Sequence, residues 1–165
     1  MAPKYHRTVK CIDIENIVGG SEFVSNRYAA VKDQIWEFNS PTPHMLYLAS
    51  GPSAIKNNPL LWDWSEARWF EGRGIDGAEI ALCDRILSDP IVRNSSHLLL
   101  CSGDHYFCDI VDQLQFEGID VTVMSRESAL SHDLARRVRH LIMVPEFGAD
   151  EVDRYYDAWN TGRVN

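Results

Sequence analysis

The stretch HLLLCSGDHYF (residues 97–107) decides the fold and carries the first candidate site residue. Residues 98–101 form a continuous apolar run, which is typical of a strand that is buried on both faces of a parallel sheet. The run stops at Ser102-Gly103-Asp104, where the glycine permits a sharp turn. Asp104 therefore follows the carboxyl end of a core strand, the edge at which open α/β sheets bind ligands. The alternative is that Asp104 only caps the following helix, because aspartate is a favoured N-cap residue.

The composition indicates one globular domain over residues 1–165. Hydrophobic residues make up 45% and charged residues 24%, which are ordinary globular values. No apolar run approaches the roughly 20 residues of a membrane span, and residues 1–10 lack the apolar segment of a signal peptide. We therefore expect no membrane partner. The net charge of −8 disfavours broad electrostatic binding to nucleic acid but permits a cation site.

The four cysteines, Cys11, Cys83, Cys101 and Cys108, do not form a C-x-x-C pair. Three of them lie in apolar segments, where a free cysteine behaves as a small hydrophobic residue. Disulfides are rare in reducing compartments. The pattern predicts reduced thiols in a cytoplasmic protein.

Strands and helices alternate along the chain. The expected strands are 8–14, 45–49, 97–101, 119–124 and 138–144, and the expected helices are 21–38, 76–87, 107–116, a short turn at 128–132, and 150–159. The stretch 60–70 is not decided between helix and strand. This alternation predicts an α/β fold, a three-layer sandwich with a central, mostly parallel sheet flanked by helices. Residues 8–144 form its core, and 150–159 is a docking helix.

A second acidic site lies in GIDGAEIALCDRIL (residues 74–87). At about 100° per residue, one helix face collects Ile80, Leu82, Cys83, Ile86 and Leu87. Glu79 falls near the middle of that face and Asp76 lies one turn earlier. A buried carboxylate needs a partner. The alternative is a capping box, in which Asp76 is the N-cap and Glu79 reaches back to its N–H.

Residues 72–77 also match G-x-G-x-x-G, the pattern of dinucleotide-binding loops. The match is weak evidence alone. Asp76 and Glu79 would occupy the helix N-terminus where a pyrophosphate must bind. A nucleotide-binding Rossmann-type protein therefore stays as a weaker alternative.

Asp13, Glu79 and Asp104 converge on one crevice if the 8–14 and 97–101 strands are neighbours. Carboxylates about 5 Å apart repel each other by roughly 3 kcal/mol per pair at an effective dielectric of about 20. A hard cation removes that cost, and Mg²⁺ or Mn²⁺ prefers oxygen ligands while it keeps water for chemistry. The residues therefore favour a metal-activated water that attacks a phosphodiester.

Four motifs in this order resemble the NYN domain family, PIN-like metal-dependent ribonucleases. Residues 13–16 (DIEN) resemble the D-x-x-N motif, and residues 77–82 (GAEIAL) resemble G-A-D-x-A-L with Glu in place of Asp. Residues 102–107 (SGDHYF) resemble S-G-D-x-D-F, and residues 118–123 resemble G-x-x-V-x-V. The resemblance covers roughly residues 8–144.

The resemblance implies a PIN-like sheet and an acidic Mg²⁺ or Mn²⁺ site that acts on RNA. It implies Asp13, Glu79 and Asp104 as metal-binding acids, with Asn16 orienting Asp13 or touching the scissile phosphate. The candidates for supporting roles are Asp76, Ser102, His105 and Asp109. His105 is either a proton donor or a solvent-facing loop histidine. Asp109 is considered because Tyr106 stands where many members carry a second Asp.

Contacts to RNA are sought among basic residues. The candidates are Lys56, Arg73, Arg126 and Arg137, with Arg136 and Arg139 nearby in the sequence. Together these basic residues could hold a few phosphates of RNA. The alternative is that they are solvated arginines on the protein surface. Two functions stay open: a metal-dependent endoribonuclease, and a non-catalytic NYN-like module that binds RNA or a protein partner. Homodimer formation also stays open.

Overall fold

The computed structural model describes residues 4–19, 25–52 and 66–146. Four of the sequence predictions lie outside the described residues. They are the helix start at Ser21, the role of Lys56, the conformation of 60–65 and the helix at 150–159.

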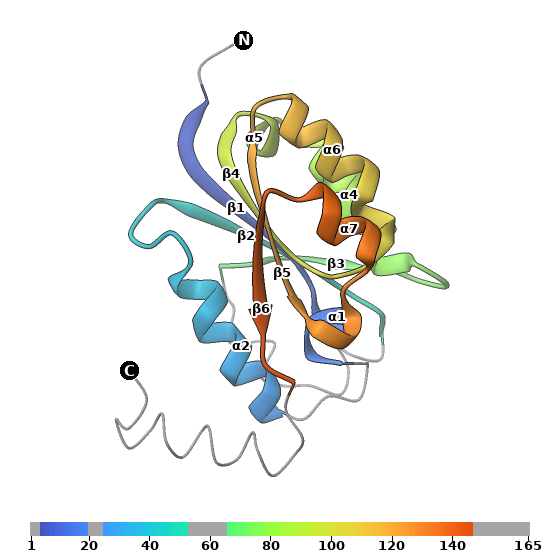
Figure 1. Cartoon of the computed structure of the whole chain (residues 1–165). Coiled ribbons are helices and arrows are strands. Elements are labelled where there is room, and N and C mark those ends of the chain that lie inside the picture. Colours follow the sequence, from blue (N-terminus) through green and yellow to red (C-terminus); the bar gives the residue numbers. More distant parts are fainter. Residues whose placement is uncertain (1–3, 20–24, 53–65, 147–165) are drawn as a thin grey trace.

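A six-stranded sheet forms the centre of the molecule (Figure 1). Its strands are β1 (Tyr5–Asp13), β2 (His44–Ser50), β3 (Arg68–Glu71), β4 (Ser95–Cys101), β5 (Asp120–Arg126) and β6 (His140–Val144). The strand order is β3-β2-β1-β4-β5-β6, and every neighbouring pair is parallel. The order reverses between β1 and β4, so the crevice at their carboxyl ends is the topological switch point where such sheets bind ligands.

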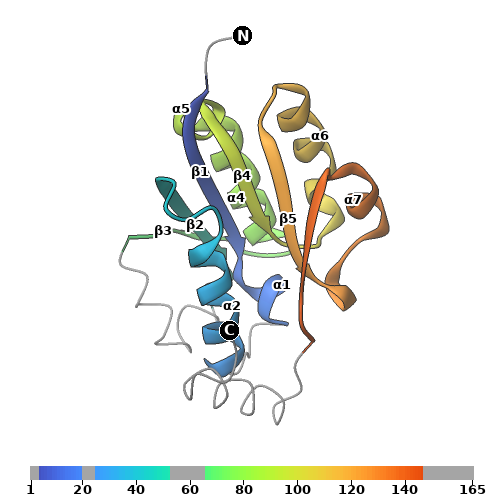
Figure 2. The same ribbon diagram turned by 60° about the vertical axis from the view of Figure 1, so that its left-hand side comes forward.

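Helices cover both faces of the sheet (Figures 1 and 2). The helices are α1 (Ile14–Val18), α2 (Ser25–Glu37), α4 (Gly77–Ser88), α5 (Pro90–Arg93), α6 (Cys108–Phe116) and α7 (His132–Arg137). Two 3₁₀ turns, η2 (His105–Phe107) and η3 (Glu127–Ala129), follow β4 and β5. Side chains of α1 and α2 pack in one apolar cluster, and side chains of α4, α6 and α7 pack in the other. The α/β sandwich is therefore confirmed.

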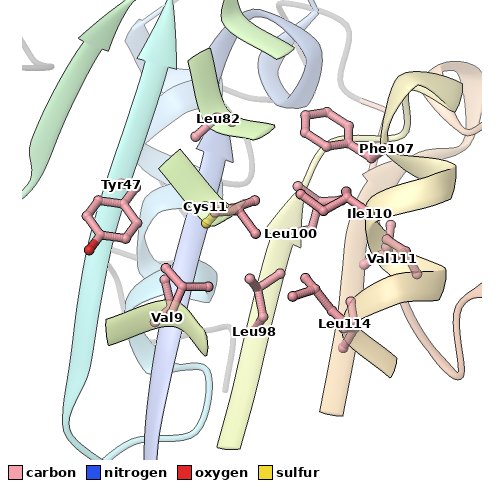
Figure 3. Packing of buried hydrophobic residues seen from close by; sticks show 14 of the residues in the cluster. Val9, Cys11, Tyr47, Leu82, Leu98, Leu100, Phe107, Ile110, Val111 and Leu114 are labelled. Atoms are coloured by element: carbon pink, nitrogen blue, oxygen red, sulfur yellow. The ribbon is translucent and has the colours of Figure 1, made fainter. Parts of the chain in front are cut away.

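The two central strands are apolar because both of their faces are covered. On one face Leu98 and Leu100 of β4 meet Leu82 of α4 and Val111 of α6 (Figure 3). On the opposite face Leu99 packs in the cluster that includes α1 and α2. These side chains are 0 or 1% exposed. Each buried leucine contributes about 1.5–3 kcal/mol, so the HLLLC run anchors the sheet.

Local predictions differ from the structure in two helical segments. Ile80 and Leu87 are 42% and 45% exposed, because α4 buries the narrower stripe of Ala78, Leu82 and Ile86. The short turn expected at 128–132 is two elements, η3 and α7. The predicted face was therefore too wide: Cys83 still packs against the core from a half-buried position, but Ile80 and Leu87 do not belong to it.

The structure also contains elements that the sequence pattern left open or did not indicate. Part of the undecided stretch forms β3, a short edge strand that pairs with β2. Helix α1 was not predicted, because its five residues directly follow a strand.

All four cysteines are free; Cys11, Cys101 and Cys108 are buried and Cys83 is half-buried. Within the described ranges, no helix combines the length and the apolarity that a membrane crossing requires.

Candidate functional site

The site lies at the carboxyl ends of β1 and β4, at the switch point of the sheet. Ile12 of β1 lies opposite Cys101 of β4, so Asp13 and Ser102 follow side by side. The expectation that these two strands are neighbours is therefore confirmed.

Asp13 is almost completely buried, with 1% of its surface exposed. As the N-cap of α1, its Oδ1 accepts a hydrogen bond from the Asn16 N–H (3.4 Å), and its Oδ2 accepts one from the Ser102 hydroxyl (3.2 Å). Burial, together with the negative charge of Glu79, raises the pKa of Asp13 to about 7, although these two donors oppose the shift. Near neutral pH about half of the molecules therefore carry a protonated Asp13.

Asn16 connects three segments that are far apart in the sequence. Its side-chain oxygen accepts a hydrogen bond from the Gly103 N–H (2.9 Å). Its backbone carbonyl accepts two from the Arg126 guanidinium, at 3.1 and 2.9 Å. A Cβ at Gly103 would overlap with the Ser125 hydroxyl, so glycine lets this loop approach β5. The Asn16 side chain thus fixes the Gly103 loop, while Asp13 receives the backbone N–H of Asn16, which any non-proline residue could donate. The two predicted roles of Asn16 stay predictions.

Asp104 caps the turn that follows it, as one of the two interpretations proposed. Its Oδ1 accepts a hydrogen bond from the Tyr106 N–H (2.8 Å), while the Asp104 N–H donates to the Ser102 hydroxyl (3.3 Å). The imidazole Nδ1 of His105 lies 3.1 Å from the same Oδ1, and the His105 side chain is 80% exposed. Capping does not exclude a site role, because the Asp104 charge also acts on Glu79.

Glu79 is half-buried in the first turn of α4, and the capping box is not formed. The N-cap, Asp76, has a left-handed backbone (φ 55°), and its side chain makes no capping hydrogen bond. Burial raises the pKa of Glu79; its own backbone N–H opposes the shift, and the charges of Asp104, Asp76 and Glu15 add to it. A local helix cap therefore does not account for this carboxylate.

A pocket of about 160 Å³ opens between the ends of β1 and β2 and the start of α4. It is lined by Asp13, Glu15, Asn16, Gly51, Gly72, Gly74, Asp76, Gly77, Ala78 and Glu79. Four of these residues are acidic. The pocket therefore joins two of the predicted acids, Asp13 and Glu79, whereas Asp104 lies beyond its lining.

Glu15 is a site residue that the sequence analysis did not select. Its Oε1 accepts a hydrogen bond from the Gly51 N–H (2.8 Å), which ties α1 to the end of β2. Its charge also raises the pKa values of Asp13 and Glu79. The D-I-E-N motif contains Glu15, but its partner lies 36 residues away and only the fold brings them together.

The glycine pattern at residues 72–77 is explained by backbone packing. Gly72 and Gly77 lie against each other, and a Cβ on Gly72 would overlap with the backbone of Gly77. The loop does follow a strand, β3, and precede a helix, as a dinucleotide loop would. The carboxylates of Asp76 and Glu79 still occupy the helix start, so the charge of the pocket disfavours a pyrophosphate.

The carboxylates of the pocket are the ligand type that a hard divalent cation prefers, but in the described residues they are not spaced as three ligands of one ion. The pocket offers oxygen ligands, and burial, with the neighbouring carboxylates, raises the pKa values of Asp13 and Glu79, so that a cation would stabilise their charged forms. Across 4–19, 25–52 and 66–146, however, no three Asp, Glu, His or Cys side chains are grouped closely enough to hold one ion. An ion here would take few protein ligands and retain water, as Mg²⁺ commonly does.

The remaining candidates lie outside the pocket or contribute to it only at its edge. Arg73 is an exposed partner of Glu71, which lies 2.9 Å away. Arg137 is paired with Asp112, and its Nη1 lies 3.9 Å from Asp109. The Asp109 side chain is fully exposed there, so the fold does not bring it to the position of the missing acid.

Arg126 is a structural residue in this arrangement rather than an open phosphate contact. Besides Asn16, its guanidinium contacts Ser128 (3.0 Å) and Glu146 (3.3 Å), and its side chain is 20% exposed.

No family model matches the chain, and no curated protein matches it at a significant level. The chemistry of the site therefore rests on its own geometry.

Proposed function

We propose that this chain is a Mg²⁺- or Mn²⁺-dependent endoribonuclease of the NYN-like type. One observation carries the proposal: a buried and a half-buried carboxyl, Asp13 and Glu79, line one pocket at the switch point, and both have raised pKa values. Keeping two such groups together is costly without a cation, and perturbed carboxyls in a cleft are typical of functional sites. The ordered motifs that resemble the NYN family support the same function.

Asp13 and Glu79 would hold the cation, with Asp76 and Glu15 adding negative charge at the pocket wall. The bound cation would supply an activated water and polarise a phosphodiester oxygen. Ser102 and Asn16 fix the Asp13 carboxyl through its two oxygens. His105, which lies 3.1 Å from Asp104 and is exposed, would be the proton donor to the leaving oxygen.

The second candidate is a non-catalytic NYN-like module that binds RNA or a protein partner. Two observations favour it. In the part of the chain that the structure describes, the acids do not form a group of three around one ion. Tyr106 occupies the place of a further acid in the motif, and Asp109 does not replace it.

Labelled single-stranded and structured RNAs, incubated with Mn²⁺, Mg²⁺ or EDTA, separate the two candidates. We expect cleavage by the wild-type chain with either metal, and none with EDTA. Asp13→Asn should lose cleavage, whereas Asp109→Asn, which alters an exposed carboxylate outside the pocket, should retain it. Absence of metal-dependent cleavage by a folded wild-type chain that still binds RNA would favour the non-catalytic module.

We further propose that the protein acts in the cytoplasm. Its four cysteines are free, and three of them are buried, as is common for proteins of reducing compartments.

RNA is the proposed partner, and dimer formation remains a separate prediction. Gel filtration with light scattering measures the latter directly.

A further inference from the structure

Tyr106 stands beside the acidic pocket, and its role is not explained by the metal chemistry. Its N–H is fixed by Asp104, and its ring meets the buried ring of Phe107 edge-to-face, with centroids 6.3 Å apart. Tyr106 nevertheless remains 39% exposed. The backbone is therefore held in place while part of an aromatic ring is presented to solvent.

Tyr106 lies close to α4. Turn η2, which contains Tyr106, packs against α4. Partial desolvation and the nearby groups Cys83, Asp76, Asp84 and Glu79 raise the pKa of the Tyr106 phenol. Ile80, 42% exposed, lies one helical turn from Asp76, Cys83 and Asp84, and so shares their side of the helix. Tyr106 thus lies near Asp76 and Glu79, two acids that line the pocket, although neither Tyr106 nor Ile80 lines it.

The arginines expected to bind RNA are already neutralised by partners. Arg73 pairs with Glu71, Arg126 with Glu146, and Arg137 with Asp112. Because the chain also carries a net charge of −8, phosphate contacts from these residues give little affinity. RNA that reaches this pocket therefore gains little binding energy from these three arginines.

We propose that Tyr106 stacks against a nucleobase next to the scissile phosphate, so that the site takes unpaired RNA. The proposal rests on the ribonuclease function above and specifies its substrate class. Stacking on an aromatic side chain requires a base that is free of its partner strand, and it tolerates any base because each has a π face. Binding of this kind also depends only weakly on salt, since few counterions are released.

The test uses the full chain and a short single-stranded RNA that carries one 2-aminopurine. Binding is followed by fluorescence and anisotropy with Ca²⁺, and in parallel with EDTA. Tyr106→Ala should weaken binding roughly ten- to a hundred-fold and abolish the stacking quench, whereas Tyr106→Phe should retain both. Phe116→Ala is the matched control, because Phe116 is a 90% exposed aromatic residue at the distant end of α6.

Two further measurements sharpen the test. Tyr106→Leu preserves an apolar side chain but cannot stack on a base. If stacking matters, its RNA affinity should be as low as that of Tyr106→Ala; if only apolar packing matters, its affinity should equal that of wild type. Wild-type binding should fall less than about tenfold between 50 and 200 mM salt, and a blunt duplex of the same sequence should bind much more weakly.

The outcomes distinguish this inference from the function on which it rests. A wild-type chain that cleaves unpaired RNA, with Tyr106→Ala equally tight and equally quenched, overturns the stacking role alone. Preference for the duplex also overturns it. A folded wild-type chain that neither binds nor cleaves RNA overturns both proposals.

Discussion

At the scale of single residues, Asp13 is the carboxyl group whose ionisation the fold disfavours most clearly. Its pKa is about 7 in the folded chain, above the ordinary value of 3.8. Between these values the folded state binds more protons than the unfolded state, so the contribution of Asp13 to stability is full below about pH 4. That contribution is lost as pH rises through about 7. At alkaline pH the apo protein therefore carries a charge that destabilises it.

The variant Asp13→Asn tests this cost. We expect the apo variant to be more stable than wild type at pH 8 by roughly 1–3 kcal/mol, because the charge is gone and the amide can still hydrogen-bond. At pH 4 the difference should nearly vanish. Urea unfolding at both pH values measures it, with Asp109→Asn as the exposed control. Equal stabilities of wild type and Asp13→Asn at pH 8 would contradict the raised pKa.

Glu79→Gln tests the second carboxyl of the pocket. Because the capping box is not formed, the amide should not destabilise α4, and the apo protein should be as stable as wild type or more so. The melting shift produced by Mn²⁺ should fall, and cleavage should drop by orders of magnitude, since a neutral amide is a poor ligand for a hard cation. Asp84→Asn changes an exposed acid of the same helix and serves as control. A normal shift and normal cleavage in Glu79→Gln would remove Glu79 from the site.

At the scale of secondary-structure elements, α1 is positioned by a residue 110 positions away in the sequence. The two hydrogen bonds from Arg126 of β5 to the Asn16 carbonyl hold this five-residue helix, which is too short to be stable alone. Asn16 in turn fixes Asp13 and the Gly103 loop. The orientation of the acids therefore depends on β5 as well as on β1 and β4.

Arg126→Gln should loosen α1 without removing an acid. We expect a loss of about 1–3 kcal/mol in the free energy of unfolding, because a buried carbonyl loses a charged donor and Glu146 loses its partner. Hydrogen exchange at the Gly103 amide should accelerate. Arg137→Gln breaks only exposed ion pairs, so the stability of the protein should change little. Unchanged exchange at Gly103 would show that α1 is held without Arg126.

At the scale of the whole molecule, cation binding should stabilise the fold in a pH-dependent way. An ion that binds only the folded state adds RT ln(1 + [L]/Kd), about 2.7 kcal/mol at a concentration of 100 Kd. The ion needs the deprotonated form of Asp13, so the gain should be large at pH 8 and small at pH 5.5. Thermal melts with and without Mn²⁺ at both pH values measure this. A melting temperature that Mn²⁺ leaves unchanged at pH 8 would count against the metal site.

The sequence predicts the sheet and the positions of two acids because those signals are local. Asp13 and Asp104 each follow a strong apolar strand, and parallel pairing places both at the same edge of the sheet, although Asp104 lies beyond the pocket that Asp13 lines. The same signals are weak for β3, a four-residue edge strand with two exposed residues. Glu15 and Arg126 could not be assigned from the sequence, because their partners lie 36 and 110 residues away. Long-range contacts of this kind appear only when the fold is known.

The long span of the Asn16 contacts has a consequence for the synthesis of the protein. The segments that meet at Asn16 are joined only after residues 103 and 126 have left the ribosome and β4 and β5 have paired. A nascent chain that ends before β4 contains Asp13 and Glu79 but lacks the loop and the arginine that orient them. The pocket is therefore completed late in synthesis, after β5 has joined the sheet.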